Sequence, residues 1–231
     1  MQLFILPYAG GSVAAFRKLT DLIDGKVDVV TVEYAGRGSR AKETLPKDIW
    51  EMVDDAVTYC NERRNKGIPF AIMGYSMGSV LAYEMLTRKA IPGELKHFFI
   101  SAEVSPKDRS LELRKAADPS EERILERVRQ LGGLDERLLS NKRFRDIYIT
   151  PMLNDYRAFF GYRFPAHRGK VSVNATVFYS EKDTALEDVK KWNELIEGEF
   201  VFFEFGDNHF FINQHYREMA EVINNTLLQK V

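Results

Sequence analysis

The sequence is poor in cysteine and has no excess of charge of either sign. Cys60 is the one cysteine among 231 residues, which excludes an internal disulfide and a metal site built from cysteines. The 33 basic residues are balanced by 34 acidic ones, and without a long basic run a nucleic acid is not an expected partner. No apolar run approaches the roughly 20 residues that cross a bilayer. We therefore expect a cytoplasmic protein with no membrane contact, no metal and no cofactor.

Segments typical of strands alternate with segments that have helical spacing. The expected strands are 3–6, 27–33, 69–73, 95–102, 175–180 and 200–205. The expected helices between and after them are 14–23, 48–64, 77–86, 186–197 and 215–229. Strands separated by helices of this length predict a mostly parallel central sheet covered by helices on both faces. We expect a single α/β domain over residues 1–231.

The alternation is interrupted once, between residues 107 and 165. This stretch has no strand signal and contains two helical patterns, at 118–131 and 142–160. Ligands of open parallel sheets bind at the carboxyl ends of the strands, and the insertion leaves the sheet at that edge. We therefore expect residues 107–165 to form a helical lid rather than a packing appendage, with Gly132-Gly133 as a flexible joint.

The pentapeptide Gly74-Tyr75-Ser76-Met77-Gly78 is the most informative motif in the chain. An apolar strand precedes it and strong helix formers follow it, which is the setting in which Gly-x-Ser-x-Gly forms a sharp turn with an exposed hydroxyl. The two glycines allow the backbone to pass close to its neighbours. A chance Gly-Ser-Gly loop would not need this setting, so we interpret Ser76 as a nucleophile.

A serine nucleophile needs a base and a carboxylate that orients the base. His209 follows the expected strand 200–205 in a loop, at the strand end where a base belongs. Asp183 follows the strand 175–180, and the order Ser76, Asp183, His209 is that of α/β-hydrolases. Glu103 follows an earlier strand and remains the alternative acid. The other histidines, which favour structural or exposed positions, are His97, His167 and His215.

The oxyanion of an acyl-transfer reaction needs two backbone N–H donors. One is expected from Met77, the residue after the nucleophile. The other is expected from the glycine-rich loop Pro7-Tyr8-Ala9-Gly10-Gly11-Ser12, where we favour Ala9 and keep Tyr8 as the competitor. The loop lacks Gly-Lys-Ser/Thr, which argues against a phosphate-binding loop.

Several segments together resemble the type II thioesterases, the stand-alone editing enzymes of nonribosomal peptide and polyketide synthesis. The matching segments run in order through nearly the whole chain: Pro7 to Ser12, Phe16-Arg17, Gly36-Arg37-Gly38, Gly74 to Gly78, Gln130-Leu131-Gly132-Gly133, Asn154-Asp155-Tyr156-Arg157, Asp183, Trp192 and His209-Phe210-Phe211. Tyr75 departs from the pattern, since the family usually has histidine there. The histidine loop departs as well, with Asp207-Asn208 in place of Gly-Gly.

The resemblance implies an α/β-hydrolase fold with a helical lid. It implies hydrolysis of acyl groups from the 4′-phosphopantetheine thiol of acyl or peptidyl carrier proteins, to clear misprimed or stalled synthases. It also places the triad acid after the later strand, which favours Asp183 over Glu103. Specificity is then expected in access and docking, with Phe159 and Phe160 at the mouth of the site.

Two other functions remain open from the residues alone. A small-molecule carboxylesterase or an acyltransferase could use the same scaffold and triad. A non-enzymatic binder could share the fold, although such proteins usually lose a triad member, and Ser76, Asp183 and His209 are all present. With no evident self-pairing surface, we expect a monomer.

Overall fold

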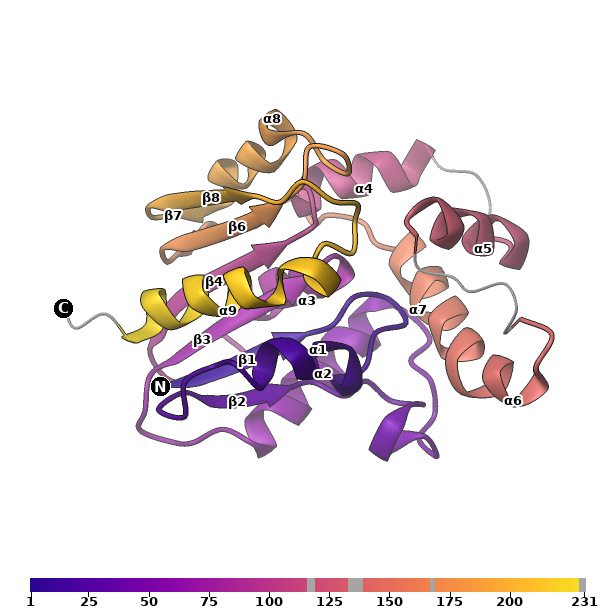
Figure 1. Ribbon diagram of the computed structural model, residues 1–231, viewed down its shortest axis with the longest axis horizontal. Coiled ribbons are helices and arrows are strands. Elements are labelled where there is room, and N and C mark those ends of the chain that lie inside the picture. Colours follow the sequence, from indigo (N-terminus) through magenta and orange to yellow (C-terminus); the bar gives the residue numbers. More distant parts are fainter. Residues whose placement is uncertain (116–118, 133–138, 167–168, 229–231) are drawn as a thin grey trace.

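The computed structural model describes residues 1–115, 119–132, 139–166 and 169–228. Its centre is a six-stranded sheet in which every neighbouring pair is parallel, as the sequence predicts (Figure 1). Across the sheet the order is β2 (Asp28–Thr31), β1 (Gln2–Leu6), β3 (Phe70–Tyr75), β4 (Leu95–Ser101), β6 (Ala175–Tyr179) and β8 (Phe200–Glu204).

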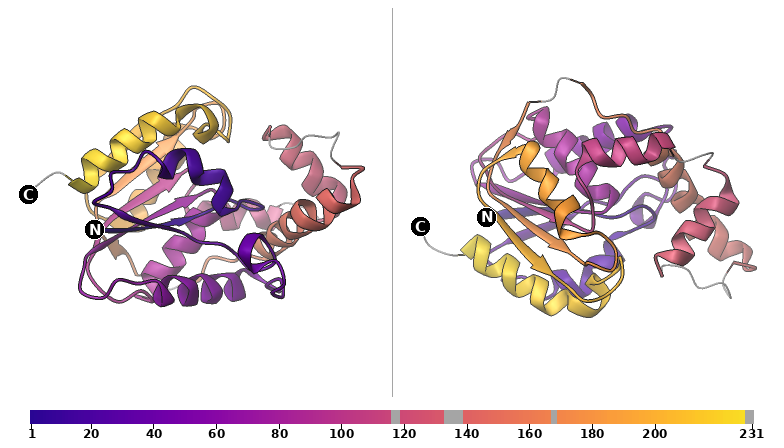
Figure 2. Two further views of the ribbon diagram at one scale, coloured as in Figure 1. Left: turned by 60° about the horizontal axis from the view of Figure 1, so that its bottom comes forward. Right: turned by 90° about the horizontal axis from the view of Figure 1, so that it is seen from above.

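Helices cover both faces of this sheet, because alternate strand residues point to opposite sides. On β1, Leu3 and Ile5 belong to a core with α1 (Val13–Thr20) and α9 (Ile212–Leu228). Phe4 and Leu6 belong to the opposite core, with α2 (Ile49–Glu62) and α3 (Met77–Thr87). Figure 2 shows α1 and α9 on one side of the sheet and α2 on the other.

Helix α2 illustrates how local sequence sets an element boundary. The Asp48 carboxylate accepts from the backbone N–H groups of Trp50 at 2.8 Å and Glu51 at 2.9 Å, and so caps the helix start.

Near the other end of α2, Cys60 is fully buried in the core, and burial raises the pKa of its thiol to about 12.

The insertion contributes helices at the carboxyl end of the sheet (Figure 1). They are α4 (Pro106–Lys115), α5 (Glu121–Gln130), α6 (Lys142–Phe144), a π-helical turn (Arg145–Ile149) and α7 (Thr150–Phe160). Apolar residues of α5, including Ile124 and Val128, share one cluster with Met152 and Leu153 of α7 and with Ile149 of the π-helical turn. No strand occurs among the described residues of 107–165, as expected.

Several element boundaries differ from expectation, and two of them have a clear local cause. The helix expected from residue 118 begins at Glu121, because the Ser120 side chain caps it by accepting from Arg123 N–H; residue 118 itself lies outside the described residues, as do Gly133 and His167. The helix expected over 186–197 is two short turns, α8 (Leu186–Val189) and a 3₁₀ turn (Lys190–Glu194). It ends early because β7 (Ile196–Glu197) pairs with β5 (Val171–Ser172), and pairing with a neighbouring segment overrides the local helical preference.

Candidate active site

Ser76 lies on a strained turn between β3 and α3. Its φ of 51° and ψ of −123° put a residue with a side chain in a region that is unfavourable for L-residues, as in a nucleophile elbow. The neighbouring glycines are required sterically: a Cβ on Gly74 would lie 2.3 Å from Ser79 Cα, and one on Gly78 would lie 2.1 Å from the Leu6 carbonyl oxygen. The Ser76 N–H donates to the Ser101 carbonyl at 2.7 Å, which fixes the turn to β4.

His209 lies in the loop between β8 and α9, and its Nδ1 is 2.7 Å from Asp183 Oδ2. The two side chains are only 8% and 9% exposed, so this hydrogen bond is shielded from water. A carboxylate that accepts from Nδ1–H leaves Nε2 as the basic nitrogen. His209 and Ser76 line the same cavity.

Glu103, the alternative acid, has other partners. Its Oε1 accepts from Arg109 Nε at 2.7 Å and from the Val104 N–H at 3.0 Å. Burial raises the pKa of the Glu103 carboxyl, although the charge of Arg109 opposes the shift. Glu103 lines the cavity with His209, but it is Asp183 that accepts the hydrogen bond from the imidazole Nδ1–H.

Ala9 and Met77, the expected oxyanion donors, both line this cavity. Met77 is the first residue of α3, so its N–H lies in the first turn, where backbone donors have no partner within the helix. The Tyr8 ring packs 5.7 Å from the Tyr75 ring and 5.0 Å from the Phe210 ring. Among the described residues, no hydrogen bond occupies the Ala9 N–H.

The cavity has a volume of about 70 Å³ and is walled largely by the insertion. Three of its polar residues were not expected there: Arg109 on α4, Arg127 on α5 and Tyr156 on α7. Of these, only Tyr156 belongs to a segment singled out in the sequence, and no role was assigned to it. The aromatic residues at its wall include Phe159 and Phe160, as expected. A larger hollow of about 550 Å³ lies at the amino ends of the strands, around His97 and Thr176, and contains none of the expected catalytic residues.

Two absences hold for the described part of the chain. Among those residues, no three His, Cys, Asp or Glu side chains gather as a metal site would require. Within the same ranges, no helix is both long and apolar enough to cross a membrane.

A parallel sheet with helices on both faces and a serine on a strained strand-to-helix turn defines the α/β-hydrolase class. Comparison with known families narrows this class. The thioesterase domain family model matches residues 1–227. The chain belongs to the thioesterase domain family.

Individual relatives are similar in sequence, and solved structures are similar in fold. Thioesterase TesA from Mycobacterium marinum is 27% identical over 235 residues, covering 99% of this chain and 91% of TesA. Thioesterase PikA5 from Streptomyces venezuelae is 25% identical over 239 residues, covering 99% and 81%. The structure of RedJ, the thioesterase from the prodiginine pathway of Streptomyces coelicolor, superposes with a TM-score of 0.83 at 28% identity, over 97% of this chain and 85% of RedJ. ClbQ from the colibactin NRPS/PKS pathway gives a TM-score of 0.84 at 24% identity, over 98% and 96%.

Proposed function

We propose that this protein is a serine thioesterase that removes acyl groups from the 4′-phosphopantetheine arm of carrier proteins and so clears misprimed or stalled synthases. The observation that carries the proposal is the His209–Asp183 hydrogen bond beside a cavity that His209 shares with Ser76. Membership of the thioesterase domain family supports the thioester as the bond cleaved. The relatives named for prodiginine and colibactin synthesis support carrier-bound substrates.

In the proposed acylation step, His209 Nε2 accepts the proton of the Ser76 hydroxyl while Ser76 Oγ attacks the thioester carbonyl carbon. The oxyanion that forms accepts from the N–H groups of Ala9 and Met77. The C–S bond then breaks, and the imidazolium returns the proton to the departing thiolate. Asp183 holds the imidazole in the required tautomer and stabilises its charged form.

Deacylation repeats these roles with water as the nucleophile. His209 accepts a proton from water as the water oxygen attacks the Ser76 ester. The tetrahedral intermediate again places its oxyanion against Ala9 and Met77. Its collapse releases the carboxylic acid, and the proton returns from His209 to Ser76 Oγ.

We also assign the insertion, residues 107–165, to a lid within a single domain of residues 1–231. Helices α4, α5 and α7 each contribute side chains to the cavity wall, which supports this assignment. Substrate must therefore pass these helices to reach Ser76. The pantetheine arm is long and narrow, so a covered site suits it better than a bulky ester.

The decisive experiment measures release of a short acyl group from an acyl-phosphopantetheinyl carrier protein, with the same acyl group on a simple oxygen ester for comparison. We expect faster turnover of the carrier thioester, and loss of all turnover in Ser76→Ala. Turnover of the ester alone would indicate a carboxylesterase and contradict the carrier-protein function. Transfer to an alcohol instead of water would indicate an acyltransferase, and no turnover together with no fluorophosphonate labelling of Ser76 would indicate a binder.

The triad acid has its own test. Asp183→Asn is expected to lower kcat by about 10³- to 10⁴-fold, because the amide favours the wrong imidazole tautomer. Glu103→Gln serves as the matched control and is expected to lower kcat far less, since Glu103 bonds Arg109 rather than His209. A larger fall in kcat in Glu103→Gln than in Asp183→Asn would identify Glu103 as the triad acid.

A further inference from the structure

The loop that carries Ala9 rests directly on lid helix α7. The Gly10 N–H donates to Asp155 Oδ2 at 2.8 Å, although the two residues are 145 positions apart in sequence. Gly10 has a φ of +78°, and a Cβ there would lie 2.7 Å from Met152 Cγ, so the loop and the helix touch with no space for a side chain. Met152 and Asp155 are one helical turn apart and present one face to the loop.

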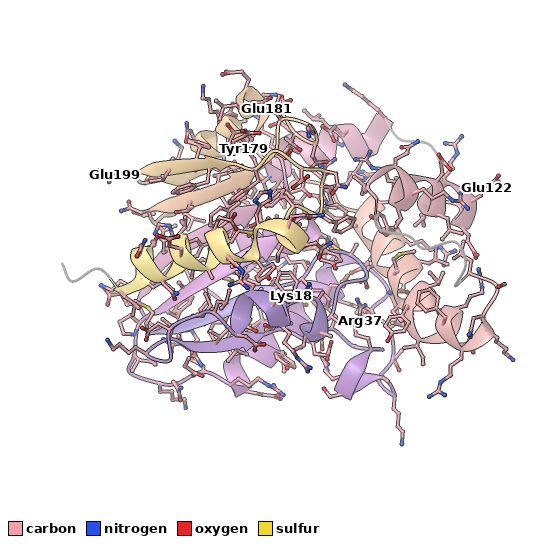
Figure 3. The ribbon with its side chains drawn as sticks, in the orientation of Figure 1. Lys18, Arg37, Glu122, Tyr179, Glu181 and Glu199 are labelled. Atoms are coloured by element: carbon pink, nitrogen blue, oxygen red, sulfur yellow. The ribbon has the colours of Figure 1, made fainter. Side chains whose placement is uncertain are left out.

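Arg37 completes this contact from a third segment, the turn between β2 and the short helix Gly38–Arg40. Its Nη1 and Nη2 donate to the two oxygens of Asp155, at 2.6 Å and 2.7 Å. Nη1 also donates to the Gly11 carbonyl at 3.1 Å. The N–H of Gly10 and the C=O of Gly11 are thus both held, one by each member of the same ion pair. Figure 3 shows Arg37 at the end of the sheet that faces the insertion helices.

This pair is almost completely removed from water, with side-chain exposures of 4% for Arg37 and 0% for Asp155. Removing two charges from water is costly unless each is paired and hydrogen-bonded, so an isolated partner would be strongly unfavourable. The bidentate geometry also fixes the direction of both side chains. The pair is consequently a rigid support rather than a flexible surface contact.

The same loop is held at its other end. The Tyr34 hydroxyl donates to the Pro7 carbonyl at 2.9 Å, and Arg37 lies over the Tyr34 ring at 5.3 Å. Fixed points at Pro7, Gly10 and Gly11 therefore flank Ala9 on both sides. Ala9 itself lines the cavity with Ser76. A donor whose neighbours are fixed in this way needs no reorganisation when negative charge develops.

We propose that Arg37 and Asp155 are positioning residues for the oxyanion hole, which hold the Ala9 N–H in its catalytic orientation by fixing Gly10 and Gly11. The inference rests on the proposed function, because it assumes that Ala9 is an oxyanion donor. It gives chemical roles to two motif segments, Gly36-Arg37-Gly38 and Asn154-Asp155-Tyr156-Arg157, that the catalytic triad leaves unexplained.

The test is the double variant Arg37→Met with Asp155→Leu, which removes both charges together so that neither is left buried alone. Kinetics use an acyl N-acetylcysteamine thioester, and binding uses an alkyl boronic acid whose tetrahedral adduct with Ser76 places an oxygen in the oxyanion hole. We expect kcat to fall about 10- to 100-fold with KM changed less than about threefold. Boronate affinity is expected to fall by a factor similar to kcat, while the melting temperature stays near that of the wild type.

The matched control is Arg40→Met with Asp55→Leu, which removes a neighbouring ion pair of 2.6 Å that does not touch the loop. We expect little change in kcat or boronate affinity. Unchanged kcat and boronate affinity in folded Arg37→Met/Asp155→Leu would overturn the inference, and so would equal losses in the control pair.

Asp155→Asn provides a second route if the double variant does not fold. The amide oxygen of Asn can still accept from the Gly10 N–H, but the amide no longer balances the charge of Arg37. We therefore expect boronate affinity to fall less than in the double variant, by about fivefold or more. No loss in a folded Asp155→Asn protein would overturn the inference. Failure of the proposed function is distinguishable, because it would appear in the wild type as absent turnover of carrier-bound substrate.

Discussion

The hydroxyl of Tyr75 donates a hydrogen bond to the backbone carbonyl of His209 at 2.6 Å. The two rings meet edge to face, 6.2 Å apart at 89°. Tyr75 is fully buried and precedes Ser76 directly, so one residue joins the nucleophile turn to the loop of the base. Tyr75 stands where the type II thioesterases usually have histidine, and in this chain its hydroxyl holds the loop that carries His209.

Tyr75→Phe should therefore loosen the base as well as destabilise the fold. The His209 carbonyl would lose its donor in a buried setting, which costs about 1 to 3 kcal/mol. We expect kcat on a simple thioester to fall about 10-fold, since small misplacements of catalytic groups have large effects. Tyr162→Phe is the matched control, because it removes a buried hydroxyl that donates to Glu84 at 2.8 Å, away from the triad. Equal kcat losses in both variants would argue against a positioning role for Tyr75.

The strained backbone of Ser76 predicts an unusual order of stability among inactive variants. Glycine tolerates its φ of 51°, whereas alanine retains the Cβ penalty. After allowing for the greater freedom of glycine in the unfolded chain, we expect Ser76→Gly to be more stable than Ser76→Ala by about 1 kcal/mol in urea unfolding.

Ser79, in the first turn of α3 and without a positive φ, provides the comparison for this strain. At an unstrained helical position glycine is expected to be less stable than alanine by about 1 kcal/mol. Ser79→Gly and Ser79→Ala should therefore show the opposite order. The same order at both positions would mean that strain at Ser76 is negligible.

Phe160 offers a sharper test of substrate access than Phe159. Phe159 is only 7% exposed, so its truncation is expected to cost about 3 to 5 kcal/mol and would confuse the result. Phe160 is half-buried and lines the cavity. We expect Phe160→Ala to slow turnover of an acyl-carrier thioester more than that of a small oxygen ester. Phe164→Ala, at a half-buried aromatic outside the cavity lining, should affect the two substrates equally.

His97 predicts a loss of stability in mild acid. Burial lowers the pKa of its imidazole from 6.5 to about 4, and Nε2 lies 2.9 Å from the Thr176 hydroxyl. Between these two values the unfolded chain binds the proton and the folded chain does not, so stability falls as pH is lowered through this window. The contribution is about 1 to 3 kcal/mol. Urea unfolding of wild type should lose more stability from neutral pH to about pH 4.5 than His97→Gln does. Equal losses of stability in wild type and His97→Gln would mean that groups other than His97 cause the pH dependence.

Much of the architecture could be predicted because it depends on local patterns. Buried parallel strands are short apolar runs, and the Gly-x-Ser-x-Gly pentapeptide specifies its own turn; both were located correctly. The structure also brings Asp183 to His209, as the strand-end argument anticipated. The catalytic roles of Ser76, Asp183 and His209, the oxyanion donors and the lid remain predictions, which the experiments above can test.

The rest depends on pairings that no local pattern encodes. Arg37 and Asp155 are 118 positions apart, and nothing in the composition near either residue indicates a buried partner. The short β5–β7 pair is likewise decided by how the ends of two connections meet, since each strand has only two residues. Arg109, Arg127 and Tyr156 reach the cavity because the insertion helices fold back over the sheet edge, which helical spacing alone does not specify.

The complete burial of Cys60 has a practical consequence. Every cleaved thioester liberates a sulfhydryl, and chromogenic disulfides report such groups as they form. The only sulfhydryl of the enzyme is inaccessible and, with a pKa of about 12, almost wholly protonated near neutrality. It should neither consume the reagent nor trap the released pantetheine as a mixed disulfide. The unaltered chain is therefore suited to continuous colorimetric assay.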